Sequence, residues 1–437
     1  MKPRTIRKHL LTALDEVAKN FKNYVNHPEK DFSRNRCISF RDVLSFPLSQ
    51  GSQAASKELP QFYTHSHVPT ASAFRQQREE VSFTAFQDVF RRFSDTCLSA
   101  LPAPCSFHGY HLLAVDGSRL VSAPNPFDTA SSVFYQDAHI QNQHHLNVLY
   151  SLSHGLYCDA VVQPYRQMNE CRALCNMVSL SSIPNGLVLA DRNYESYNVF
   201  AHLQQKNWAF LIRVKDSGYG SIASGLTLPD EDEFTAPFHL ALSRRENSRH
   251  VFPQIPPDDM HNHFKKIAAK NPFDFPFDDN GVFMLHFSVV RIRFSDTHSE
   301  TFIINLDLPI HELKLLYAMR WSVETSFRHL KYAVGLLSFH AKKEKLLLQE
   351  IFAALTFFNF SRLIASSPAI PKKKRKYAYT INFSNVVRLC RRFLLNLESS
   401  PRIECLLLRD LSPIRPNRTY PRKLHSIGFV SFNYRSV

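Results

Sequence analysis

The sequence has few of the features that mark zinc-binding, membrane or secreted proteins. Its eight cysteines are scattered without a Cys-x-x-Cys pair, and Cys171 and Cys175 form only a lone pair on an expected helix. Neither a zinc site nor a disulfide framework is therefore predicted. No run approaches the roughly eighteen apolar residues of a membrane span, and Asp15 and Glu16 interrupt the apolar run near the N-terminus. We expect no signal peptide, no membrane partner and a cytoplasmic protein.

Acidic residues are also scarce relative to basic ones. The chain has 53 Lys and Arg against 38 Asp and Glu, a formal net charge of +15. Residues 366–437 contain 15 of the basic residues and 3 acids, so 15 − 3 = +12 of the excess lies in this basic C-terminal region. Such an excess favours a polyanionic partner, nucleic acid ahead of an anionic membrane. At 437 residues the chain is long enough for two or three globular domains.

The stretch 311–340 has no proline and a single glycine, Gly335, which predicts a long helix. One face of this helix is apolar and predicts a core contact. The other face gathers polar side chains, namely Tyr317, Arg320, Glu324, Arg328 and Lys331. One carboxylate among cations suits a metal-binding acid bordered by phosphate-holding groups. The simpler alternative is a solvated face on which Glu324 and Arg328 form an ion pair.

Between residues 110 and 214 the pattern changes to short apolar runs. Strands are expected at 110–115, 145–152, 156–162, 186–190 and 208–214, with helices at 168–180 and about 193–205. This order, in which three strands are followed by a helix, a strand, a second helix and a last strand, is typical of a ribonuclease-H-like mixed sheet covered by helices. The predicted fold class is therefore α/β.

Two acids follow strands in this region. Asp116 follows the run at 110–115, and Asp191 follows the run at 186–190. Ligands collect at the carboxyl ends of strands in open α/β sheets, so both carboxylates are candidates for a site that Glu324 would complete. Taken alone, Asp116 followed by Gly117 is more often a hairpin turn.

A family resemblance strengthens this hypothesis. Tyr317, Arg320, Glu324 and Lys331 are spaced Y-x2-R-x3-E-x6-K, which resembles the YREK signature of bacterial cut-and-paste DDE transposases of the insertion-sequence-four type. The contexts AVDGS around Asp116 and LADRNY around Asp191 are also similar to that family. The resemblance implies a DNA transposase acting in a bacterial cytoplasm, in association with the nucleoid.

The resemblance also implies roles for these residues. Asp116, Asp191 and Glu324 would bind two Mg²⁺ ions, for which Mn²⁺ can substitute, and would catalyse phosphodiester cleavage and strand transfer. Tyr317, Arg320 and Lys331 would hold phosphates. The expected partners are double-stranded DNA with terminal inverted repeats, a target DNA and a second copy of the chain in a paired-end complex. Relatives use a hairpin intermediate.

Further DNA contacts are expected in the flanking regions. Thr70 is a plausible N-cap of a helix that exposes Arg75 and Arg78, and a second helix follows at 83–93. The pair fits a helix-turn-helix-like DNA reader, although any two amphipathic helices share this pattern. Near residue 371 the sequence PKKKRK supplies Lys372, Lys373 and Lys374. We interpret this run as a linker that grips the DNA backbone, with a nuclear import signal as the alternative.

The predicted organisation has five parts. They are a helical N-terminal DNA-binding region at 1–107, the first part of the ribonuclease-H-like core at 108–214, a β-rich insertion at 215–299, the second part of the core at 300–365 and the basic region at 366–437. Residues 1–107 are expected to be removable without unfolding the core. Two alternatives remain: a catalytically silent, transposase-derived DNA-binding protein, and a ribonuclease-H-like nuclease without strand transfer.

Overall fold

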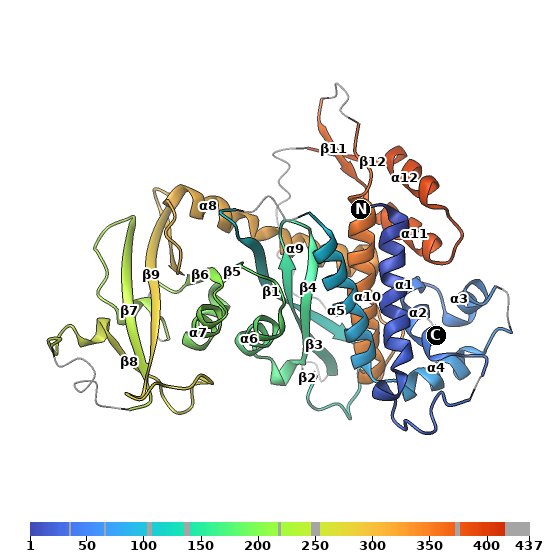
Figure 1. Cartoon of the computed structure of the whole chain (residues 1–437), viewed down its shortest axis with the longest axis horizontal. Coiled ribbons are helices and arrows are strands. Elements are labelled where there is room, and N and C mark those ends of the chain that lie inside the picture. Colours follow the sequence, from blue (N-terminus) through green and yellow to red (C-terminus); the bar gives the residue numbers. More distant parts are fainter. Residues whose placement is uncertain are drawn as a thin grey trace.

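The computed structural model describes residues 1–34, 36–64, 67–102, 107–134, 140–216, 220–245, 254–371 and 376–415. At its centre is a 10-stranded mixed sheet in the order β2-β3-β1-β5-β6-β10-β9-β7-β8, with β4 also paired to β3. The sheet crosses the molecule from β7 and β9 at one end to a thick layer of helices around α10 at the other (Figure 1). The α/β class expected from the sequence is confirmed.

The five strands expected between residues 110 and 214 are all present. They are β1 (His111–Ser122), β3 (Ile140–Ser151), β4 (Leu156–Pro164), β5 (Gly186–Ala190) and β6 (Ala209–Val214). Their spatial order is β4-β3-β1-β5-β6. β3 is antiparallel to β1 and β4, whereas β5 is parallel to β1 and β6.

β1 is longer than predicted, and this corrects the position of Asp116. The strand continues through Asp116 to Ser122 because residues 113–122 of β1 pair with residues 142–151 of β3. The glycine and polar residues after Val115 have low strand propensity, but the cross-strand pairing with β3 overrides it. Asp116 therefore lies inside a strand, and the hairpin-turn alternative is wrong.

The segment expected to be a β-rich insertion lengthens the same sheet. β10 (His298–Ile304) pairs antiparallel with β6, and β9 (Val282–Ser295), β7 (Phe234–Ser243) and β8 (Phe264–Lys266) follow outward. The short β2 (Ser132–Phe134) lies beside β3 near the opposite end. The strands of this segment agree with the β-rich character expected of residues 215–299.

Helices cover both faces of the sheet. α6 (Glu170–Leu180) and α7 (Tyr197–Gln205) pack on one face, around a core that includes Val188, Phe200 and Phe210. α8 (Ile310–Met319) covers β5, β6 and β10 on the other face. α9 (Trp321–Arg328), α10 (Glu344–Ala365) and α5 (Phe83–Ala100) continue that layer over β1, β3 and β4. Burial from both sides explains why these strands read as continuous apolar runs.

α10 is the central helix of the helical layer. Its length and apolar composition would allow it to cross a membrane, but 78% of the apolar stretch is buried inside the protein. It packs against β4 and against neighbouring helices from both ends of the chain. Those helices are α1 (Pro3–Lys19), α2 (Phe40–Ser49), α4 (Ala71–Glu80), α5 and α11 (Phe383–Leu394).

The N-terminal helices share this core, which changes one expectation. Phe86, Phe90 and Phe93 are buried as predicted, but they pack with α10 in a single hydrophobic cluster. Removing residues 1–107 would uncover α10, and this shared core argues against the expectation that the remainder stays folded.

Smaller elements complete the described chain. α3 (Ala55–Phe62) lies in the N-terminal region, and α12 (Ser400–Arg409) packs on α11. A two-stranded sheet joins β11 (Ala378–Ile381) to β12 (Leu411–Ile414).

Candidate active site

The predicted helix at 311–340 is two α-helices and a π-helical turn. α8 begins after Pro309, Arg320 joins it to α9, and η6 (His329–Val334) continues as a π-helix. Gly335 ends the run with a left-handed φ of 101°, which a residue with a side chain adopts only at a cost. π-Helical turns inside helices are frequent at functional sites. The helix of about six turns expected within this stretch is confirmed, because helical structure runs from Ile310 to Val334.

Asp116 and Asp191 lie side by side in the sheet. β1 and β5 are parallel with Ala114 opposite Leu189, and continuing this register by two residues brings Asp191 beside Asp116. Asp116 Oδ1 accepts a hydrogen bond from the Gly117 N–H at 2.8 Å. Asp191 Oδ1 accepts one from the Asn193 N–H at 2.9 Å, where it caps the short 3₁₀-helix η3 (Arg192–Tyr194). Each carboxylate is thereby held in one orientation.

Arg320 joins Asp116 to Glu324. Its Nη1 is 3.6 Å from Asp116 Oδ2, and its Nη2 is 3.5 Å from Glu324 Oε1. The Arg320 side chain is only 8% exposed, and its guanidinium lies 5.5 Å from the Tyr317 ring centroid and 5.6 Å from that of Trp321. Arg320 is therefore not on a solvated face, although Arg328 is exposed, and its guanidinium is a buried cation between Asp116 and Glu324.

The electrostatics of the site favour an added cation. Burial raises the pKa of Asp116 to about 6, and the nearby charges of Asp191 and Glu324 contribute to that rise. The Gly117 N–H and Arg320 oppose it without cancelling it. Clustered carboxylate oxygens are the ligands that hard divalent cations such as Mg²⁺ prefer. The residues present therefore fit a divalent metal.

A His145–Glu170 pair that sequence reasoning missed lies on the other face of the sheet from Asp116. His145 Nε2 is 2.8 Å from Glu170 Oε1 at the start of α6. A Cβ atom at Gly117 would lie 2.1 Å from His145 Nε2, so a side chain there would collide with the imidazole. Gly117 next to Asp116 was the only sequence signal of this close approach.

The residues expected to contact DNA have different environments. Tyr317 is buried against Phe302, with ring centroids 4.8 Å apart. Lys331 Nζ donates a hydrogen bond to the Arg119 carbonyl of β1 at 2.8 Å. Arg75 is exposed on α4. Lys372, Lys373 and Lys374 lie outside the described residues.

Arg78 does not fit the DNA-contact prediction. It is 6% exposed, donates to Gln349 Oε1 at 3.1 Å and lies 3.6 Å from Glu350 Oε1. These contacts attach α4 to α10. The prediction failed because helical periodicity could not reveal that a second helix covers this side of α4.

Comparison with known proteins identifies the class. Residues 108–360, more than half of the chain, match the family described as the transposase DDE domain, and the chain belongs to that family. It is a DNA transposase, an enzyme class that works with divalent metal ions. Among solved structures, the chain is similar to the piggyBac transposase in a synaptic complex with hairpin DNA. That similarity has 11% identity and a TM-score of 0.47, and covers 96% of this chain and 87% of the other. A comparison with curated proteins finds no match.

Proposed function

We propose that this transposase is of the insertion-sequence-four type, with Asp116, Asp191 and Glu324 as its catalytic centre. The single observation that carries the proposal is the approach of Asp116 and Glu324 to one guanidinium, with Asp191 in register beside Asp116. The strand order β4-β3-β1-β5-β6 supports a ribonuclease-H-like core, in which such acids meet. The Y-x2-R-x3-E-x6-K spacing supports the subtype.

The three carboxylates would hold two Mg²⁺ ions, or Mn²⁺ in their place. Bound metal would supply Lewis-acid activation of an attacking hydroxyl and stabilisation of the leaving oxygen during in-line displacement at phosphorus. The protein's own part is to fix the carboxylates. The Gly117 and Asn193 amides orient the two aspartates, and α9 brings Glu324 to the same face of the sheet.

Arg320 has two tasks in this proposal. Without metal its guanidinium neutralises Asp116 and Glu324, and with metal it becomes free to contact a DNA phosphate at the same place. The Tyr317 ring, fixed against Phe302, is a positioning group for that guanidinium. Lys331, anchored to β1 three residues beyond Asp116, would hold a phosphate at the margin of the site.

The remaining partners follow from charge. Exposed Arg75 on α4 and the basic region at 366–437, with Lys372, Lys373 and Lys374, would contact double-stranded DNA at terminal inverted repeats. We propose a homodimer that joins paired ends and target DNA, and an action on the bacterial nucleoid in the cytoplasm. Residues 1–107 would serve end recognition while packed on the catalytic part.

The test is a cleavage and joining assay with the full chain, Mg²⁺ and a duplex carrying the inverted repeat that flanks its gene. A transposase cuts at the repeat end and joins that end to a second DNA. Cleavage without joining would identify a nuclease, and inertness with intact end binding a silent DNA-binding protein. Either result would overturn the proposal.

A further inference from the structure

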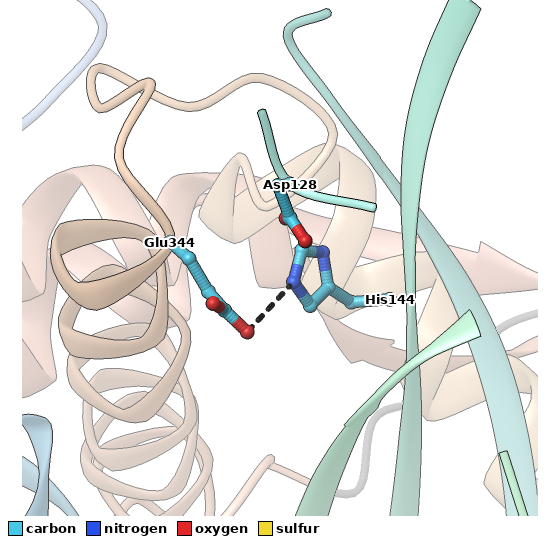
Figure 2. Close-up of side chains that lie close together, drawn as sticks. All are labelled: Asp128, His144 and Glu344. Atoms are coloured by element: carbon cyan, nitrogen blue, oxygen red, sulfur yellow. Dashed lines mark ion pairs between the residues drawn. The ribbon is translucent and has the colours of Figure 1, made fainter. Parts of the chain in front are cut away.

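A second cluster of metal-ligating side chains lies on the same face of the sheet. Asp128, His144 and Glu344 each offer a ligand atom, and these atoms all lie within 4.8 Å of one another. Asp128 comes from the connection between β1 and β2, His144 from β3, and Glu344 is the first residue of α10. In Figure 2 the carboxylates of Asp128 and Glu344 both point toward the His144 imidazole, and a dashed line joins Glu344 to it.

His144 is the unusual member of this cluster. It is 1% exposed, yet neither Nδ1 nor Nε2 has a hydrogen-bond partner among the described residues. The nearest charged atom, Glu344 Oε1, is 3.6 Å from Nε2, beyond the range of a good hydrogen bond. Burying an imidazole with both nitrogens unsatisfied is costly, so the structure calls for a further ligand of this ring.

The surrounding contacts fix Asp128 in place. Its carboxylate accepts hydrogen bonds from the backbone N–H and the hydroxyl of Ser131. Buried Asn142 donates to the Asp128 carbonyl at 3.1 Å and to the Ser131 hydroxyl at 2.8 Å. Such outer contacts orient ligands in established metal sites.

The cluster is separate from the proposed catalytic centre. His144 is paired across the sheet with Leu120, four residues beyond Asp116 on β1. At about 3.3 Å per residue this is roughly 13 Å along the strand. The two clusters share no side chain.

We propose that Asp128, His144 and Glu344 bind one divalent transition-metal ion, of which Zn²⁺ is the appropriate probe. One imidazole with two carboxylates suits a borderline ion better than Mg²⁺, which prefers oxygen ligands alone. The ion satisfies the buried ring and joins the start of α10 to β3 and to the connection after β1. Its function is structural, and it holds the helical layer to the catalytic part of the sheet.

The experiment uses the full chain with Asp116→Asn, Asp191→Asn and Glu324→Gln, so that the catalytic acids cannot contribute. The chelator-stripped protein is titrated with Zn²⁺ against a chromophoric chelator, and thermal unfolding is followed in parallel. We expect one tight equivalent and a higher melting temperature with Zn²⁺. Adding His144→Asn should weaken that equivalent more than about tenfold, since even outer-shell partners contribute about 10–100-fold.

Two further variants make the result decisive. His239 and His286 form a histidine pair outside the core, with Nδ1 atoms 2.6 Å apart, which can bind Zn²⁺ adventitiously. Adding His239→Asn to the triple variant must leave the tight equivalent intact. Glu344→Gln alters a side chain that is 43% exposed, so it tests the site if His144→Asn fails to fold. No tight Zn²⁺ equivalent, or unchanged affinity in Glu344→Gln or in a folded His144→Asn protein, would leave only a histidine–carboxylate pair and overturn the proposal.

Discussion

Two clusters of acids lie on one face of the same sheet, and the charges of their carboxylates are balanced in different ways. Asp116 and Glu324 flank the guanidinium of Arg320, a permanent cation supplied by the chain, and the charge of Asp191 acts on Asp116. Asp128 and Glu344 surround an imidazole whose nitrogens have no hydrogen-bond partner among the described residues. In the first cluster the chain itself therefore supplies a cation that partly balances the acids. The second cluster leaves both nitrogens of its imidazole without a hydrogen-bond partner among the described residues unless an ion binds, as expected of a site that holds its ion permanently.

Substitution of the three acids that we propose as catalytic should give the largest effect, because the second cluster has no proposed part in cleavage. Asp116→Asn, Asp191→Asn and Glu324→Gln should each slow end cleavage by at least about a hundredfold, the scale of losing one preorganised electrostatic group. End binding should be nearly unchanged, because no major DNA contact is lost. Gel-based cleavage and filter binding measure the two effects.

The matched control is Glu312→Gln, a carboxylate on α8 that pairs with His108 at 2.8 Å. It should cleave like wild type. Cleavage within about tenfold of wild type in one of the three variants would remove that residue from the catalytic centre, since a metal ligand is worth more than this.

Removing Arg320 should leave Asp116 and Glu324 without the cation that the chain supplies, so that an ion is needed to balance their charge. In chelator, Arg320→Ala should lose about 2–3 kcal/mol of unfolding free energy, somewhat less than for a fully buried pair because Glu324 is partly exposed. Mg²⁺ should restore most of the loss, because a metal can replace the missing cation. Denaturant unfolding with and without Mg²⁺ measures both values.

Arg213→Ala is the comparison variant, because it removes a pair with Glu300, 2.7 Å away on neighbouring strands. Its loss of stability should not respond to Mg²⁺. If Mg²⁺ failed to rescue Arg320→Ala, the interpretation of Arg320 as an internal counter-ion would be wrong.

The raised pKa of the Asp116 carboxyl should make the stability of the folded protein depend on pH. Its folded-state pKa, raised to about 6, exceeds the unfolded value, so the folded state binds the extra proton between pH ~4 and ~6. The metal-free protein therefore loses stability as the pH rises through this window. Asp116→Asn removes the penalty and should gain about 2 kcal/mol at pH 7, an upper value near 3 being reduced by partial exposure and by loss of the Arg320 contact.

Unfolding in chelator between pH 4 and 8 tests this expectation. The difference between Asp116→Asn and wild type should grow up to about pH 6 and then level off. A difference that is constant with pH would mean that Asp116 ionises as freely in the folded protein as in the unfolded chain.

The strands and helices were predictable wherever an apolar run was bounded by turn residues. β5 was predicted with its observed bounds, and Asp191 follows it as expected. β1 was cut short because its second half contains Gly117 and polar residues that only pairing with β3 makes into a strand. The local sequence pattern therefore located the two aspartates in the chain but did not show that Asp116 lies inside a strand.

Contacts between distant residues could not be predicted. Arg78 was assigned to an exposed face and Arg320 to a polar face that would hold phosphates, because a helical wheel does not show what covers a helix. Arg320 faces Asp116 from 204 positions away, and Arg78 faces residues of α10. The second cluster joins residues 128, 144 and 344, and only the fold brings them together.

The smallest effect concerns Lys331, at the margin between the two clusters. Its ammonium group donates to the Arg119 carbonyl, which lies between Asp116 and the Leu120–His144 pair along β1. If it also holds a phosphate, Lys331→Ala should reduce the slope of log affinity against log salt by about one unit, independently of DNA sequence. The loss should be smaller than for Arg320→Ala, because an ammonium acts as a point charge while a guanidinium can grip a phosphate with two donors.

Lys314→Ala is the control, because Lys314, on α8, is already paired with Glu233 at 2.8 Å. Titrations across a salt series on one end duplex decide the matter, and equal slopes for Lys331→Ala, Lys314→Ala and wild type would leave Lys331 with only its structural contact to β1.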